Sequence, residues 1–198
     1  MKKIGVFGGT FNPVHNAHVK TAILVKEKLS LDHIIVIPAG NPPHKLGISL
    51  IDGKKRLKMC ELAFKDYSDI KISDIEIKKQ GVSYTCETLL SLSKNDRKLY
   101  FICGADMFLT LKKWKNPSEI FKLAKIVTIP RNNDDKATLE KYSEELKSLG
   151  ASCIILDSEK MSESSSEIRE RLKNGEVCDD MLSSDVLEYI NKNNLYRS

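Results

Sequence analysis

The chain has 198 residues, a formal net charge of +5 and 41% hydrophobic residues, which suits one globular domain and excludes a disordered or fibrous chain. No apolar run is long enough to span a bilayer, and the lysines are spread out, unlike the dense basic stripe with interleaved aromatics typical of nucleic-acid binders. We therefore expect neither membrane nor nucleic acid as a partner. A lysine-rich surface explains the charge, and a basic pocket for a phosphorylated ligand is compatible with it.

Short apolar, β-branched runs alternate with helix-length segments along the whole chain. The runs are apolar on both faces, as in buried parallel strands, and they cover Ile4–Phe7, Ile34–Ile37, Ile70–Ile72, Tyr100–Cys103, Ile126–Ile129 and Ile154–Leu156. The segments between and after them predict helices over Val14–Leu29, Lys54–Phe64, Cys86–Leu92, Pro117–Leu123, Leu139–Leu149, Ser166–Lys173 and Asp185–Asn191. Strict alternation predicts an α/β fold with a single Rossmann-like, doubly wound parallel sheet. We expect one domain, 1–198, with a C-terminal helical part over 162–198.

The stretch GGTFNPVHNAH, Gly8–His18, follows the first predicted strand. Asn12 is a good N-cap and Pro13 a good first helical residue, so we expect the first helix to begin near Pro13. His15 and His18 then lie on the helix face that packs on the sheet. The first turn places both imidazoles over the carboxyl ends of the strands, where glycine backbone and helix N–H groups suit a phosphate. Two solvated histidines at a helix start are the alternative.

A second candidate anion site follows the last predicted strand. Ser164 and Glu167 have capping-box spacing, so the serines here can simply begin a helix. Ser166 and Arg169, however, lie three residues apart on one helix face. A hydroxyl, helix N–H groups and a guanidinium together suit an anion, and we favour this interpretation because capping and binding coexist at helix starts.

The loop 39–52 after the second predicted strand is long and proline-rich, which favours a functional or moving segment. It begins with AGNPPHK, and Lys45 at the end of this motif is a candidate phosphate contact, with solvent exposure as the alternative. Whether the loop closes over a substrate is a hypothesis.

Three further motifs lie at or near predicted strand ends. Thr85, in GVSYT, begins a predicted helix, a position that suits a small carboxylate. Gly104 permits close approach of a ligand to the backbone, and Asp106 can accept hydrogen bonds from ribose hydroxyls. Trp114 is the only tryptophan, either partly buried in the core or stacked on a flat heteroaromatic ring.

These motifs resemble a known family. GGTFNPxHxAH is similar to the signature of the nucleotidylyltransferase superfamily with its H-x-G-H element, and the Ser165, Ser166, Ile168 and Arg169 set is similar to its second signature, I-S-S-T-x-I-R. Within the superfamily, PPHK, GVSYT, FICGAD and Trp114 resemble the nicotinate-nucleotide adenylyltransferases. The chain departs from the family pattern at Ala17 (usually Gly), Lys79 (commonly Arg) and Glu163 (usually apolar).

The resemblance implies transfer of AMP from ATP to nicotinate mononucleotide, giving deamido-NAD and pyrophosphate in NAD biosynthesis. It implies ATP contacts by Gly8, Gly9, Thr10, Phe11, His15, His18, Gly104, Asp106, Ser165, Ser166 and Arg169. Nicotinate mononucleotide would contact Asn12, Lys45, Tyr84, Thr85 and Trp114. The phosphate nucleophile is already ionised, so the catalytic residues, His15, His18, Lys45 and Arg169, would align phosphates and neutralise charge. Mg²⁺ would arrive on the ATP phosphates, without a protein metal site.

Alternatives remain open. An adenylyl- or cytidylyltransferase acting on another phosphorylated acceptor, such as phosphopantetheine, shares the H-x-G-H element, and a non-catalytic nucleotide-sensing module shares the fold. The five cysteines are odd in number and spaced unlike metal or redox motifs, so we expect buried free thiols and a cytoplasmic protein. The sequence leaves the oligomeric state undecided.

Overall fold

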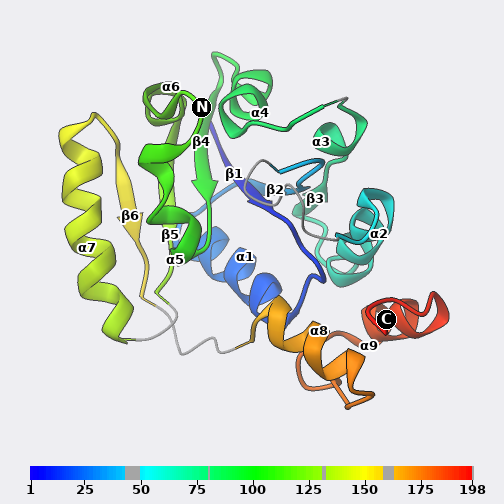
Figure 1. Cartoon of the computed structure of the whole chain (residues 1–198). Helices are drawn as coiled ribbons and strands as arrows, with labels where there is room; N and C mark the ends of the chain where they lie inside the picture. Colours follow the sequence, from blue (N-terminus) through cyan, green and yellow to red (C-terminus); the bar gives the residue numbers. More distant parts are fainter. Residues whose placement is uncertain (43–49, 80, 131–132, 158–162, 198) are drawn as a thin grey trace.

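The computed structural model describes residues 1–42, 50–79, 81–130, 133–157 and 163–197 (Figure 1). Within these ranges one parallel sheet has the strand order β3-β2-β1-β4-β5-β6. The strands are β1 (Lys2–Gly9), β2 (His33–Pro38), β3 (Ile70–Ile72), β4 (Arg97–Ile102), β5 (Ala124–Thr128) and β6 (Cys153–Ile155). Each expected apolar run contributes one strand, so the predicted α/β sheet is confirmed.

Helices cover both faces of this sheet (Figure 1). One face packs against α1 (Asn16–Leu29), α2 (Gly53–Ala63), α8 (Ser165–Lys173) and α9 (Ser184–Lys192). The other packs against α4 (Thr85–Leu92), α5 (Ala105–Phe108), α6 (Pro117–Leu123) and α7 (Asn133–Ser148). Alternate strand residues enter the two cores: Ile34 and Val36 face the first, Leu99 and Phe101 the second. The doubly wound arrangement is therefore confirmed.

Three short elements have no counterpart in the sequence prediction. They are α3 (Ile75–Lys78), α5 and the 3₁₀ helix η2 (Leu111–Lys113). Each is four residues or shorter, too short to show a periodic apolar face. Helix α3 follows β3, and α5 and then η2 follow β4, so all three come after the carboxyl end of a strand.

The strand order reverses direction around β1. The chain moves outward from β1 to β2 and β3 on one side, then returns to place β4 beside β1 and continues to β5 and β6 on the other. Crevices outside the carboxyl ends of the strands at such a switch point are where open α/β sheets bind ligands. The residues that follow β1, β2 and β4 are therefore the candidates for a ligand site.

Helix α1 begins at Asn16, later than the sequence predicts. His15, not Asn12, is the N-cap, with an extended backbone at φ −144° and ψ 173°, and the Asn12–Pro13 peptide is cis. Arg169 Nη1 donates to the Asn12 carbonyl at 2.8 Å, and Ser165 Oγ donates to the Pro13 carbonyl at 2.9 Å. The prediction that Asn12 caps the helix and Pro13 opens it is wrong, because contacts with α8 hold this segment in an irregular turn.

The C-terminal helices pack around the start of α1. The Asn16 N–H donates to the Met181 carbonyl at 2.9 Å, and the Tyr196 hydroxyl donates to Asn12 Oδ1 at 2.8 Å. Ser164 Oγ accepts from the Glu167 N–H at 3.1 Å, so Ser164 is the expected cap of α8. Across the described ranges no helix combines the length and apolar character needed to cross a membrane.

Candidate active site

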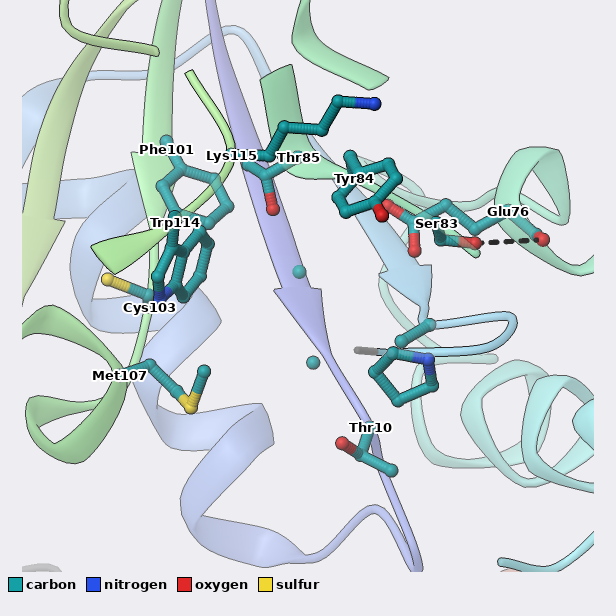
Figure 2. A pocket seen from close by; sticks show the side chains of 14 residues that line it. Thr10, Glu76, Ser83, Tyr84, Thr85, Phe101, Cys103, Met107, Trp114 and Lys115 are labelled. Atoms are coloured by element: carbon teal, nitrogen blue, oxygen red, sulfur yellow. Dashed lines mark hydrogen bonds between the residues drawn. The ribbon is translucent and has the colours of Figure 1, made fainter. Parts of the chain in front are cut away.

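A pocket lies at the switch point, outside the carboxyl ends of β1, β2 and β4 (Figure 2). We call it the ring pocket. Its lining comes from segments widely separated in the sequence: Gly8, Gly9, Thr10, Ala39, Pro42, Glu76, Ser83, Tyr84, Thr85, Phe101, Cys103, Met107, Trp114 and Lys115. The residues predicted from GVSYT, from the single tryptophan and from the first glycine turn therefore lie together.

Aromatic side chains form two sides of the ring pocket. Trp114 and Tyr84 lie on opposite sides of it (Figure 2). Trp114 is held by a hydrogen bond from Nε1 to Thr110 Oγ1 at 3.0 Å and by an edge-to-face contact with Phe101, with ring centroids 5.9 Å apart. Because packing and a hydrogen bond fix the indole in place, the pocket offers a prepared apolar surface for a flat ring.

Positive charge gathers beside Tyr84. The Lys115 ammonium lies 3.9 Å from the centroid of the Tyr84 ring, and Glu87 forms ion pairs with Lys115, at 3.2 Å, and with Lys79. These hydrogen bonds, chiefly the one from Lys79, lower the pKa of the Glu87 carboxyl. Lys79, which departs from the family's arginine, thus pairs with Glu87, and the three side chains carry one net positive charge.

The two predicted histidines are in contact at the start of α1. Their ring centroids are 3.7 Å apart, and the His15 N–H donates to His18 Nδ1 at 3.2 Å. A ring nitrogen that accepts a hydrogen bond carries no proton, so neutral His18 carries its proton on Nε2. The Phe11 ring makes an edge-to-face contact with the His18 imidazole, with ring centroids 5.0 Å apart and an interplanar angle of 69°.

Arg169 and the serines of α8 lie against the same turn. Arg169 Nη1 donates to the carbonyls of Asn12 and Ser165, at 2.8 and 3.0 Å, while Nη2 donates to Ser166 Oγ at 3.1 Å. The guanidinium is therefore held by three acceptors. We name the group His15, His18, Ser165, Ser166 and Arg169 the histidine–arginine cluster. The structure brings together the two anion sites that the sequence predicts separately.

Other predicted residues take different positions. Phe11 and Asn12 are buried, 2% and 3% exposed. A Cβ at Gly9 would meet the Phe11 ring at 2.9 Å, so any larger residue there would displace this buried ring. Gly104 and Asp106 are exposed at the start of α5. Lys45 lies outside the described residues.

The sequence prediction missed two charged side chains: Arg56, which is buried, and Glu76, which is partly buried. Arg56 in α2 is 1% exposed and donates to the carbonyls of Thr10, Gly40 and Ile51. Glu76 in α3 lines the ring pocket and accepts a hydrogen bond from Thr88 Oγ1 at 2.7 Å. Burial lowers the pKa of Arg56 and raises that of Glu76. The isoleucines on both sides of Glu76 are the one sequence signal of its burial; Arg56 has none.

The structure also places the other two departures from the family pattern, Glu163 and Ala17, and the five cysteines. Glu163 forms an ion pair with Lys20 of α1 at 3.5 Å, and Ala17 is buried in α1. All five cysteines are free, as expected, and four of them are buried. Cys103 lines the ring pocket, but burial raises the pKa of its thiol and keeps it protonated.

Comparisons with known proteins agree with this arrangement. A family model described as cytidylyltransferase-like matches residues 6–171. A probable nicotinate-nucleotide adenylyltransferase of Clostridium botulinum is 41% identical over 198 residues, covering 100% of this chain and 99% of that protein. A Clostridium perfringens protein of the same description is 42% identical over 200 residues, with the same coverage. The fold is similar to Plasmodium falciparum nicotinic acid mononucleotide adenylyltransferase complexed with NaAD, at TM-score 0.81 and 21% identity, covering 99% of this chain and 98% of that one.

Proposed function

Because the chain belongs to the nicotinate-nucleotide adenylyltransferase family, we propose that it transfers AMP from ATP to nicotinate mononucleotide, giving deamido-NAD and pyrophosphate in NAD biosynthesis. The single observation that carries the proposal is a juxtaposition. An apolar ring pocket and a histidine–arginine cluster lie along one turn of chain, the residues that follow β1. One can hold a pyridine ring and the other a polyphosphate.

The ring pocket is the proposed site of the nicotinate. Trp114 offers its face for stacking, and Tyr84 bounds the other side. Helix α4 begins at Thr85 within the pocket, and its N–H groups and positive dipole end suit the ring carboxylate. The ammonium of Lys115 adds positive charge nearby. An amide in place of the carboxylate would gain less from these charges.

The histidine–arginine cluster is the proposed site of adenylyl transfer. A phosphate oxygen of nicotinate mononucleotide attacks the α-phosphorus of ATP; the new P–O bond forms as the bond to the leaving pyrophosphate breaks. No proton has to be removed, so positioned donors supply the catalysis. His18 can donate from Nε2 and Arg169 carries a permanent charge. Ser166 Oγ accepts from Arg169, which leaves its own hydroxyl proton to donate to a phosphate.

The remaining predicted contacts stay proposals. The backbones of Gly8, Gly9, Thr10 and Phe11 would lie along the phosphates, and Asn12 would contact nicotinate mononucleotide. Gly104 and Asp106 would meet the adenosine ribose, Ser165 would support the phosphate site with His15, and Lys45 would reach the joining phosphate.

Mg²⁺ is the proposed cofactor, carried by ATP. The cluster consists of imidazoles, hydroxyls and a guanidinium, which do not suit Mg²⁺, and the described ranges hold no group of three or more His, Cys, Asp or Glu side chains able to bind a metal. Bound through the ATP phosphates, the ion would neutralise oxygen charge there. We also propose that the chain is a single domain, 1–198, and that it is cytoplasmic, which its free cysteines support.

The test is pyrophosphate release with ATP and Mg²⁺, comparing nicotinate mononucleotide, nicotinamide mononucleotide and phosphopantetheine as acceptors. Turnover on nicotinate mononucleotide that is lost in His18→Ala supports both the activity and the role of the cluster. Turnover on phosphopantetheine alone would retain the superfamily chemistry and overturn the assignment of Tyr84, Thr85 and Trp114. Tight ATP binding without turnover on any acceptor would point to the nucleotide-sensing alternative.

A further inference from the structure

One wall of the ring pocket is a short irregular segment, residues 39–42, that follows β2. We call it the pocket wall; Ala39 and Pro42 line the pocket directly. The Ala39 N–H donates to the Gly9 carbonyl at 2.8 Å, and the Asn41 carbonyl accepts from the Ser83 N–H at 3.2 Å. Outside regular secondary structure, such a segment keeps its place only through contacts of this kind.

Arg56 holds this wall through hydrogen bonds to backbone carbonyls. Its guanidinium donates to the Gly40 carbonyl at 3.3 Å, to the Thr10 carbonyl at 2.7 Å and, through Nε, to the Ile51 carbonyl at 2.9 Å. Thr10 belongs to the turn after β1 and Gly40 to the pocket wall, so one side chain links two sides of the pocket. Only the fork of an arginine donates in three fixed directions.

Glu76 packs against the same wall. Its carboxylate accepts a hydrogen bond from the Thr88 hydroxyl at 2.7 Å, and its backbone carbonyl accepts one from the Ser83 hydroxyl at 3.4 Å. The backbone of Glu76 is so close to Gly40 that a Cβ there would overlap the Glu76 carbonyl. Gly40 therefore lies between the Glu76 backbone, which packs against it, and the Arg56 guanidinium, which donates to its carbonyl.

We propose that Arg56 and Glu76 are positioning residues that clamp Gly40 and thereby set the pocket wall against the turn after β1. The clamp deepens, and rests on, the function proposed above. Arg56 bonds to both the pocket wall and Thr10, so it affects the nicotinate and the ATP sides of the site. Glu76 packs on the pocket wall and bonds to Thr88 of α4, so its influence is confined to the nicotinate side.

The first test measures the wall itself, in the free protein. Hydrogen exchange is followed in peptides that cover residues 39–41, for wild type, Arg56→Met, Arg56→Lys and Glu76→Gln. The expected result is exchange at least about tenfold faster in both Arg56 variants, because each lost hydrogen bond frees the backbone it held. Glu76→Gln keeps the backbone contact with Gly40 and one oxygen that can accept from Thr88, so its increase should be smaller. Lys58→Met, which removes one positive charge from the exposed side of the same helix, is the matched control and should exchange like wild type.

The second test measures substrate binding. Trp114 is the only tryptophan and lines the pocket, so its fluorescence reports the Kd of nicotinate mononucleotide without turnover. We expect Arg56→Met and Arg56→Lys to raise the Kd and the KM for this substrate by about tenfold, with kcat within about threefold, because a displaced wall weakens ground-state and transition-state binding alike. The KM for ATP should rise in the Arg56 variants only. A merely structural role would lower the active fraction, and hence kcat, and leave both KM values unchanged.

The outcomes separate clearly. Unchanged exchange at 39–41 and unchanged Kd in folded Arg56→Lys and Glu76→Gln would overturn the clamp, even if Arg56→Met does not fold. Faster exchange with an unchanged Kd would show that the wall is held but sets no affinity, which also overturns the positioning role. If wild type shows no turnover with nicotinate mononucleotide, the proposed function fails, and the exchange measurement still decides whether the clamp exists.

Discussion

The ring pocket and the histidine–arginine cluster adjoin the same turn of chain but are held in different ways. Trp114 is fixed by aromatic packing and one side-chain hydrogen bond, and the pocket it bounds is largely apolar. Arg169 is fixed by backbone carbonyls, including one from a segment far away in the sequence. The pocket is thus suited to discriminate by shape and the cluster to act on charge. Substitutions in the two regions should therefore change different kinetic parameters: chiefly KM for the ring pocket and chiefly kcat for the cluster.

The largest expected effect is in the cluster. His18→Ala should lower kcat by about 100- to 1,000-fold, the usual result of removing one positioned transition-state donor, while the KM for nicotinate mononucleotide changes little. Steady-state kinetics with both substrates varied measure this. If His18→Ala instead raises the KM for nicotinate mononucleotide by as large a factor as it lowers kcat, the two regions do not act on different kinetic parameters. His33→Ala, at the start of β2 and away from the cluster, is the control.

Arg169→Lys should have the next largest effect. A lysine keeps the charge but cannot hold Asn12, Ser165 and Ser166 together, so kcat/KM for ATP should fall by roughly tenfold to a hundredfold, as expected for charged hydrogen bonds worth about 1.5–3 kcal/mol. The midpoint of thermal unfolding should also fall, because the Asn12 carbonyl loses its donor. Arg171→Lys on the same helix is the matched control. Retention of full activity would show that charge alone suffices at this position.

In the ring pocket, Trp114→Ala should act on binding. We expect the KM for nicotinate mononucleotide to rise by about fivefold to a hundredfold, since base–aromatic stacking contributes about 1–3 kcal/mol, with kcat and the KM for ATP nearly unchanged. Trp114→Phe should recover part of the affinity. A fall in kcat with an unaltered KM would indicate that the indole acts on the transferred group instead of the ring.

The smallest expected effect concerns pH and Glu76. Burial raises the pKa of this carboxyl in the folded protein above the ordinary value of 4.5, so the folded state binds the proton more tightly than the unfolded state does. The resulting stabilisation is complete below pH 4.5 and is lost as the pH rises through the raised pKa. Urea unfolding across this window should show a decline in wild type relative to Glu76→Gln. The exposed Glu61→Gln variant should follow wild type; if Glu76→Gln does so too, Glu76 titrates normally.

The sheet could be predicted from the sequence because buried parallel strands are recognisable locally. Each apolar run gave one strand, and the motifs that follow strands β1, β2 and β4 met at the pocket because parallel strands end at one edge. The start of α1 could not be predicted in this way. Asn12 and Pro13 have the local pattern of a helix start, but hydrogen bonds from Arg169, Ser165 and Tyr196 decide their conformation.

The clamp illustrates a second limit of sequence reasoning. Arg56 lies in the run Lys54-Lys55-Arg56-Leu57-Lys58, where every cation looks alike, yet it alone of them is buried. Its three acceptors are backbone carbonyls, which every residue possesses and no motif marks. Only the folded structure shows which of these four cations bonds to the pocket wall.

The hydrogen bonds that join Asn12 and Pro13 to α8 and to Tyr196 also have a consequence during protein synthesis. The turn after β1 leaves the ribosome early, whereas Ser165, Arg169 and Tyr196 follow it by more than 150 residues. A nascent chain can pair its first strands, yet the turn after β1 has no contact from α8 or Tyr196 until those residues emerge. A chain that stalls before residue 165 also lacks the side chains that α8 and α9 add to one core, so that face of its sheet leaves apolar surface uncovered.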